Sequence, residues 1–288
     1  MAFPAIMIIL LISLFLTPLS AFSSLKGNQF SPSIPEILKR SDQNYEQIQT
    51  LRFHVNRRLE RGMQNLEENW EVILQKPNLF RVNYLGSPKR ILWANENSFV
   101  EYIPKAKKAL QFDLNNLSVD EQKFIFSKLI PRIAIPGFRI TITEEMLANM
   151  DFQLKNNQII KGRPAFFIHA KNKKPQKKND TVQASEIKIW IDQDRFSLLQ
   201  MEVYDGSSFM SSIQVHSFKE WQKNYWIPTR IVTANNLPQG LEKSTYRISQ
   251  LQVNSNLDPN FFDLKLPKDV DIDFATSSER KNNNPKEN

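Results

Sequence analysis

Hydrophobic side chains recur at every second position over several short segments between Asn69 and Leu110. The alternating residues are Trp70, Val72 and Leu74, and then Phe80, Val82 and Tyr84. Two short runs follow, which contain Ile91, Trp93, Phe99, Tyr102 and Ile103. A period of two residues places successive side chains on opposite faces of a β-strand. Turn residues separate the runs at Pro77-Asn78 and at Asn95-Glu96-Asn97. We therefore expect consecutive hairpins that build a curved sheet with an apolar, aromatic face.

Similar patterns continue on both sides of this region. The expected strands cover residues 51–59, 152–154, 159–160, 166–170, 187–191, 198–204, 209–218, 229–234 and 246–253. Asn156-Asn157 should form a turn between two of them, and residues 61–65 a hairpin turn. No helices alternate with the strands, which favours an antiparallel sheet. The predicted fold is mainly β with a few helices (α+β): an unclosed, strongly curved antiparallel β-barrel of about eleven strands with a helical lid.

Helical patterns occur at three places. Ser33 and Glu36 have the spacing of a capping box, and apolar residues at helical spacing follow as far as residue 48. A second capping signature begins at Ser118, and a third helical piece covers residues 143–150. The apolar residues of the second helix are Phe124, Ile125, Leu129 and Ile130. The two later helices either pack against the core or form a lid over the open face of the sheet.

The N-terminal segment has the composition of a secretory signal peptide. Residues 3–22 lack charged side chains, and small residues near Ala21 suit cleavage. We expect a signal peptide over residues 1–21, a linker over 22–33, one domain over 34–274 and a disordered tail over 275–288. Because the apolar run is nearly long enough to span a bilayer, an uncleaved N-terminal anchor is the alternative.

The composition is that of an exported globular protein. Of the 288 residues, 41% are hydrophobic and 11% aromatic, which is enough for a sizeable core. The absence of cysteine excludes disulfides, zinc–thiolate sites and the acylated cysteine of a bacterial lipoprotein. We therefore expect a soluble protein of the periplasm.

The net charge of +8 is partly concentrated in two predicted loops. The lysines concerned are Lys171, Lys173, Lys174, Lys177 and Lys178 in one loop, and Lys105, Lys107 and Lys108 in the other. These loops are either simply solvated or make transient contact with an anionic membrane surface or an acidic partner. Nucleic acid is not an expected partner, because export separates the protein from it.

No pattern of residues indicates catalysis. His54, His169 and His216 have no neighbouring carboxylate or histidine at metal-ligand spacing, and nucleophile and phosphate-loop motifs are absent from the sequence. We therefore expect no enzymatic activity, no metal and no cofactor.

Three stretches together resemble the outer-membrane lipoprotein carrier family (LolA-like). They are Lys76-Pro77-Asn78-Leu79-Phe80-Arg81, the segment from Ile91 to Pro104, and the closing segment from Leu257 to Phe262 with Leu266 to Val270. Their order and spacing extend the resemblance over roughly residues 34–273. Lys76 stands where the best-studied branch of the family has an arginine.

The resemblance implies a periplasmic carrier that shields the acyl chains of lipoproteins and moves them from the inner to the outer membrane. The donor would be an inner-membrane ABC transporter and the acceptor an outer-membrane lipoprotein, and the carrier would be a monomer. The implied lipid-binding cavity consists of Trp70, Val72, Phe80, Val82, Tyr84, Trp93, Phe99 and Tyr102. Phe124, Ile125, Leu129 and Ile130 would form the lid, with Lys76 as the lid latch, although lysine lacks the forked contact of arginine.

Other interpretations of the same residues stay open. The aromatic side chains could form an ordinary core rather than a ligand cavity. A related protein could also carry or sense another envelope lipid with the same fold. A third possibility is a non-carrier envelope interaction protein that is anchored by an uncleaved N-terminus.

Overall fold

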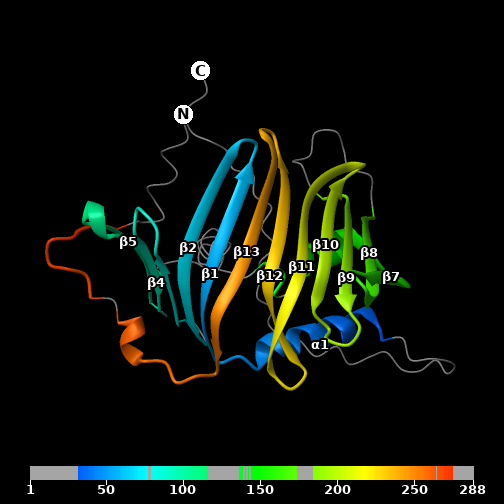
Figure 1. Ribbon diagram of the computed structural model, residues 1–288, viewed down its shortest axis with the longest axis horizontal. Coiled ribbons are helices and arrows are strands. Elements are labelled where there is room, and N and C mark those ends of the chain that lie inside the picture. Colours follow the sequence, from blue (N-terminus) through cyan, green and yellow to red (C-terminus); the bar gives the residue numbers. More distant parts are fainter. Residues whose placement is uncertain are drawn as a thin grey trace.

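The computed structural model describes most of the chain (Figure 1). The described residues are 32–76, 79–95, 97–115, 136–138, 140, 142, 144–173, 184–263 and 265–274. Outside them lie the expected signal peptide (1–21), the expected tail (275–288) and the lid residues Phe124, Ile125, Leu129 and Ile130. None of the described helices is both long and apolar enough to cross a membrane.

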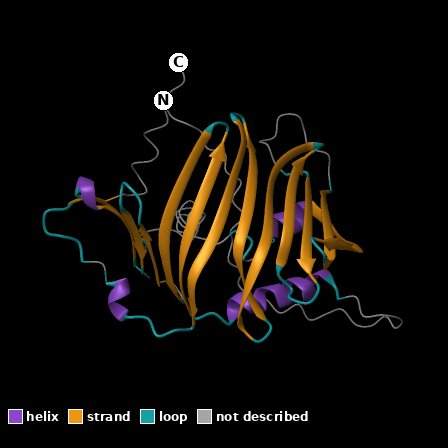
Figure 2. Ribbon diagram, in the orientation of Figure 1, coloured by secondary structure: helices purple, strands orange, loops and turns teal. Residues whose placement is uncertain are grey.

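One curved, unclosed sheet of 14 strands dominates the molecule (Figures 1 and 2). The strands are β1 (Thr50–Arg61), β2 (Gln64–Gln75), β3 (Leu79–Tyr84), β4 (Arg90–Ala94), β5 (Ser98–Ile103), β6 (Lys108–Asp113), β7 (Met150–Ile160), β8 (Arg163–Asn172), β9 (Glu186–Asp192), β10 (Leu198–Asp205), β11 (Ser208–Gln222), β12 (Tyr225–Leu237), β13 (Gly240–Val253) and β14 (Asp271–Phe274). Their spatial order is β14-β6-β5-β4-β3-β2-β1-β13-β12-β11-β10-β9-β8-β7. The predicted mainly β, curved and antiparallel architecture is confirmed.

The number of strands corrects the prediction of about eleven, and β6 and β14 were not among the expected strands. β14 pairs with β6 in parallel, whereas all other described pairs are antiparallel. The expected turn at Asn156-Asn157 is wrong as well. β7 runs through it, and a register shift between Lys155 and Gln158 accommodates the two asparagines as a bulge.

Helix α1 (Ile34–Glu46) begins with the predicted capping box. The backbone nitrogen of Ser33 donates to Glu36 Oε2 at 2.7 Å, and the Ser33 hydroxyl accepts from the backbone nitrogen of Glu36 at 3.4 Å. The hydrogen bond from the Ser33 backbone lowers the pKa of the Glu36 carboxyl. The third expected helical piece is the short helix α3 (Glu144–Asn149), and two 3₁₀ turns, η1 (Pro104–Ala106) and η3 (Pro259–Phe262), complete the described helices.

We call the face of the sheet that packs against α1 the inner face. Ile37 of α1 is fully buried against the β7–β10 half, and Ile48, just after α1, is buried against the β1–β6 half. Ile213 packs against both halves, so they form one continuous surface. Gly137 (φ +74°) lies close to the side chains of β11, since a Cβ added to it would come 3.1 Å from Ile213 and 3.3 Å from Val215. The positive φ favours glycine there, and a larger residue would also displace these side chains by a few tenths of an ångström.

The opposite, outer face of β3–β6 is covered by the C-terminal segment. Leu266, Val270 and Ile272 pack against a small buried cluster that contains Trp93 and Tyr102. The indole nitrogen of Trp93 donates to the carbonyl oxygen of Phe262 at 2.7 Å. Residues 259–274 therefore act as a strap across the outer face and end as the edge strand β14.

Candidate functional site

Six of the eight predicted cavity residues lie together on the inner face. Trp70, Val72, Phe80, Val82 and Phe99 belong to one buried cluster, and Tyr84 packs against it. Cross-strand pairing explains the grouping, because Trp70 lies opposite Tyr84 and Val72 opposite Val82. The rings of Phe80 and Phe99 are 6.0 Å apart between centroids. The six residues thus form part of one contiguous apolar cluster on the inner face, and all of them except Tyr84 are buried.

Trp93 and Tyr102 do not lie on this surface, so placing them in the same cavity was wrong. Trp93 lies opposite Arg81 in the β3–β4 ladder, whereas Phe80 lies opposite Ala94. A position on the Arg81 side of the sheet is the outer face. There Trp93 and Tyr102 contact the C-terminal strap instead.

Other strands extend the inner apolar surface well beyond the predicted residues. The additional buried members are Leu51, Phe53, Val55, Phe112, Leu114, Val215, Ile227, Ile231 and Ile248. The alternation of apolar residues in 51–59 and 229–234 is visible in the sequence, but the order of strands is not. Because β1 lies between β2 and β13, these distant segments become neighbours of Trp70.

Lys76 contacts α1, at one end of the inner face. Its Nζ donates to the carbonyl oxygens of Tyr45 at 2.8 Å and of Glu46 at 3.1 Å. A cation at the C-terminal end of a helix compensates carbonyls that lack partners within the helix and the negative end of the dipole. Tyr45 in turn meets Phe138 edge to face, with 5.7 Å between ring centroids. Lys76 thus links the end of β2 to α1, while its predicted contact with residues 124–130 lies outside the described residues.

A polar cluster occupies the other end of the inner face, where β1 and β13 meet near their hairpins. Arg57 donates to Glu68 Oε2 at 3.0 Å and, through Nε, to the buried Ser244 hydroxyl at 3.1 Å. Arg61 forms an ion pair with Glu242. Next to them lies a cleft of ≈ 460 Å³ that is lined by Leu59, Arg61, Gln64, Asn65 and Leu66. The inner face is therefore amphiphilic along its length.

Buried donors on the inner face include the indole nitrogen of Trp70, which makes no hydrogen bond to a described residue although Trp70 is only 4% exposed. Leaving a buried donor unpaired costs about 1–3 kcal/mol. Trp70 belongs to the apolar cluster and lies two positions after Glu68 in β2, so it stands at the boundary between the apolar and the polar cluster along this strand.

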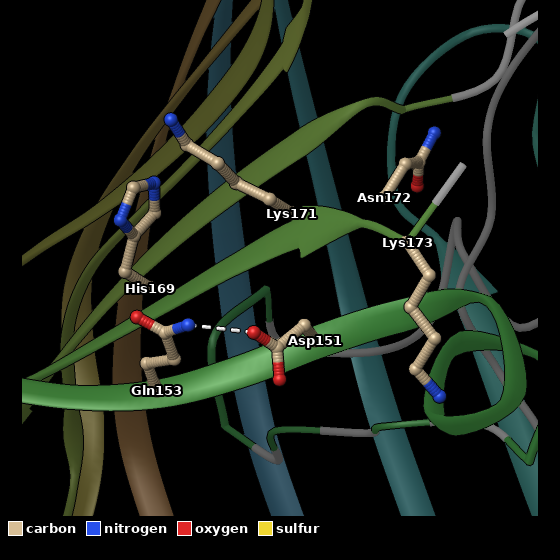
Figure 3. Close-up of a pocket in the computed structure, with 6 residues that line it drawn as sticks. All are labelled: Asp151, Gln153, His169, Lys171, Asn172 and Lys173. Carbon is tan, nitrogen blue, oxygen red and sulfur yellow. Dashed lines mark hydrogen bonds between the residues drawn. The ribbon is translucent and has the colours of Figure 1, made fainter. Parts of the chain in front are cut away.

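A second cleft, of ≈ 430 Å³, lies at the β7–β8 end of the sheet (Figure 3). It is lined by Asp151, Gln153, His169, Lys171, Asn172 and Lys173. Lys173 donates to the carbonyl oxygens of Leu147 and Ala148 and so caps α3. His169 is paired with Glu186 at 2.6 Å. Within the lining, Gln153 donates to Asp151 at 2.6 Å. In the described part of the chain no three acidic or histidine side chains gather as a metal site.

Of the lysines in the predicted basic loops, several fall in the described ranges. Lys107 forms an ion pair of 2.6 Å with Asp269, and Lys173 is occupied as the cap of α3. Lys105, Lys108 and Lys171 are exposed. Lys174, Lys177 and Lys178 lie outside the described residues.

Comparison with known proteins identifies similar structures but no close relative. A family model described only as an uncharacterized protein matches residues 140–266, and no curated protein matches the chain. A DUF1329 family protein from Desulfovibrio piger is 14% identical, with a TM-score of 0.51 over 78% of this chain and 94% of that chain.

Two further structures are similar over most of their length. A LolA superfamily protein from Nitrosomonas europaea is 14% identical, with a TM-score of 0.48 over 80% of this chain and 98% of that one. An outer membrane lipoprotein-sorting protein domain from Vibrio parahaemolyticus is 12% identical, with a TM-score of 0.48 over 78% and 95%. The chain thus shares its fold with the DUF1329 family protein, and its structural neighbours include LolA superfamily proteins.

Proposed function

We propose that this protein is a periplasmic carrier that shields the acyl chains of lipoproteins on its inner face and moves them from the inner to the outer membrane. The observation that carries the proposal is the continuous apolar surface on the inner face of an unclosed sheet. The names of the neighbouring structures and the resemblance of residues 76–81 support it.

The physical task of such a carrier is to keep acyl chains out of water. Each buried methylene group contributes about 0.8 kcal/mol, so an unshielded lipoprotein would stay in its membrane or aggregate. An apolar surface lowers this cost without any covalent step. The carrier therefore needs no cofactor, and the direction of transfer follows from the donor and the acceptor.

In this proposal the donor is an inner-membrane ABC transporter and the acceptor an outer-membrane lipoprotein. Both rest on the family resemblance. The chain's own contribution is a differential affinity: it must bind acyl chains more weakly than the acceptor does. Lys76 suits a role in setting that affinity, because it fixes α1 against the end of the sheet.

Photo-crosslinking from the two faces of the same strands tests the proposal. A benzoylphenylalanine is placed at Phe80 or Phe99, on the inner face, and at Trp93 or Tyr102, on the outer face. The outer positions are the matched controls, because they lie on the same group of strands, β3–β5, and are also buried aromatic residues. Only the inner positions should capture an acylated lipoprotein after passage through the cell envelope.

Equal capture from both faces would reject the inner face as the acyl-chain site. Capture of a phospholipid but no lipoprotein would favour a carrier or sensor of another envelope lipid. The polar cluster of Arg57, Arg61, Glu68 and Glu242 favours this second candidate, since it combines positive and negative groups at one end of the apolar surface, as a zwitterionic headgroup does. Mass spectrometry of the captured molecule separates the two.

A further inference from the structure

Basic side chains from several strands gather on the outer face near the middle of the sheet. We call Lys161, His216, Arg230, Lys243 and Arg247 the outer basic patch. All five are exposed. Arg230 and Arg247 lie directly opposite each other on β12 and β13. Side chains so placed are about 5 Å apart at Cβ, and like charges in this position destabilise a sheet.

Two local irregularities complete the patch. The register of β11 against β12 shifts between Val215 and Ser217, so His216 is the extra residue of a bulge. Lys161 has a φ of +51° in the turn between β7 and β8. This turn brings its Nζ to 3.1 Å from His216 Nε2 and 3.4 Å from Gln214 Oε1. The side chain of Lys161 therefore reaches β11, although β9 and β10 lie between β8 and β11 in the sheet.

No carboxylate of a described residue forms an ion pair with these cations. Among the described residues, no ion pair involves Lys161, Arg230, Lys243 or Arg247, and Glu60, which lies opposite Lys243, is paired with Arg58 at 3.1 Å. Burial and then the charges of Lys161, Arg230 and Lys243 lower the pKa of His216. Burial and the nearby Arg230 lower the pKa of Lys161. The patch is thus a region of self-repulsion that an anionic partner would relieve.

We propose that the outer basic patch docks the protein onto the anionic lipid headgroups of a bilayer. The chemistry of the patch favours a lipid surface over a protein. The residues between the cations are mostly polar, among them Gln214, Ser217 and Thr245, and the apolar ones are the small side chains of Val232 and Ala234. Protein interfaces depend on aromatic or apolar anchors in buried pockets, whereas clustered cations alone attract anionic lipids.

The docking surface is independent of the acyl-chain site. Its residues alternate along β12 and β13 with inner-face residues such as Ile231 and Ile248 and so lie on the opposite face. The failure of one proposal therefore leaves the other intact. Photo-crosslinking at Phe80 tests the inner face, and vesicle binding tests the outer one.

The test is co-sedimentation of the full-length protein with vesicles of phosphatidylcholine alone and of phosphatidylcholine and phosphatidylglycerol in equal parts. The patch variant is Arg230→Gln/Lys243→Gln/Arg247→Gln. The control variant is Lys105→Gln/Lys108→Gln/Lys268→Gln, which removes the same charge from exposed positions elsewhere. All three proteins share the same apolar N-terminus, so the difference between the patch variant and the control variant reports on the patch.

Wild type and control should bind the anionic vesicles at low salt, and the patch variant about tenfold more weakly or worse. Added salt should reduce the difference. Equal binding of wild type to both vesicles, or equal losses in the two variants, would overturn the proposal. It would also be overturned by patch-dependent binding to soluble polyglutamate without binding to vesicles, which would indicate an acidic protein partner.

Discussion

Lys76 donates a hydrogen bond of 2.8 Å to the carbonyl oxygen of Tyr45, and its ammonium group also lies 4.4 Å from the centroid of the Tyr45 ring. One side chain at the end of β2 thus holds the last turn of α1 through a carbonyl and through an aromatic face. The two contacts reinforce each other, since both are made to the same residue of the helix.

Replacing Lys76 should release this end of α1. We expect Lys76→Leu to lower the free energy of unfolding by about 1–2 kcal/mol, because it removes a charge-assisted hydrogen bond and a cation–π contact. Lys76→Arg should be nearly silent, since it keeps the positive charge. Urea unfolding and hydrogen exchange of the α1 amides measure both effects. In the carrier proposal, Lys76→Leu alone should also slow the transfer of bound lipoprotein to acceptor membranes, and normal transfer by both variants would remove Lys76 as a latch.

The unpaired indole of Trp70 predicts a spectroscopic response to ligand. When an acylated lipid binds the inner face, the Trp70 indole proton should shift downfield in a ¹H–¹⁵N spectrum, because it gains an acceptor. The indole of Trp93 is the internal control, since it already donates to Phe262 at 2.7 Å. Trp70→Phe assigns the signal. A ligand that moves both indoles equally, or neither, would contradict a polar contact at Trp70.

Asp192 should make the free energy of unfolding depend on pH in the acid range. Burial by itself would raise the pKa of this fully buried carboxyl, but hydrogen bonds from Arg163 and from the backbone of Arg195 and Asp194 outweigh it, so the pKa lies below its ordinary value of 3.8. The contribution is therefore complete above that value and is lost as pH falls through the folded pKa.

We expect Asp192→Asn to cost about 2–3 kcal/mol at neutral pH, because Arg163 loses its charged partner. The variant should also lose stability less steeply in acid than wild type. Chemical denaturation at several pH values between neutral and acid measures both slopes. Parallel pH profiles of the two proteins would mean that folding does not lower the pKa of Asp192.

The attachment of the strap (residues 259–274) to the outer face should depend on Trp93. Trp93→Phe removes the hydrogen bond to the Phe262 carbonyl, which leaves a buried acceptor unpaired and should cost about 1–3 kcal/mol. Limited proteolysis should then cut within 259–274 faster than in wild type. Phe99→Leu, on the inner face of the same hairpin, is the control: it should destabilise the core without selectively exposing the strap.

The sequence predicted the elements well where periodicity and local chemistry agree. Ser33 and Glu36 lie three residues apart, so their capping box depends on local spacing alone and was found where expected. The alternation of Phe80, Val82 and Tyr84 placed these residues correctly on one face. Along a single strand, the period of two fixes which residues share a face of the sheet.

The face of Trp93 could not be predicted in the same way. Within β4 the alternation fixes only that Trp93 and Ile91 share a face, and the register across the β3–β4 connection decides which face that is. In the same way, β14 is too short and too polar for a pattern and exists only through its pairing with β6. The outer basic patch depends on the order β11-β12-β13 and on a bulge, neither of which is visible as a motif.

The sheet begins at β14 and ends at β7, and no ladder joins these two edges in the described part of the chain. A closed barrel can widen only by breaking hydrogen bonds between neighbouring strands. An open sheet can change its curvature by small adjustments of twist spread over many strands, with every ladder kept intact. In the carrier proposal, the capacity of the inner face would therefore be set by bending of the sheet and would adapt to cargo of different bulk without rearrangement of the fold.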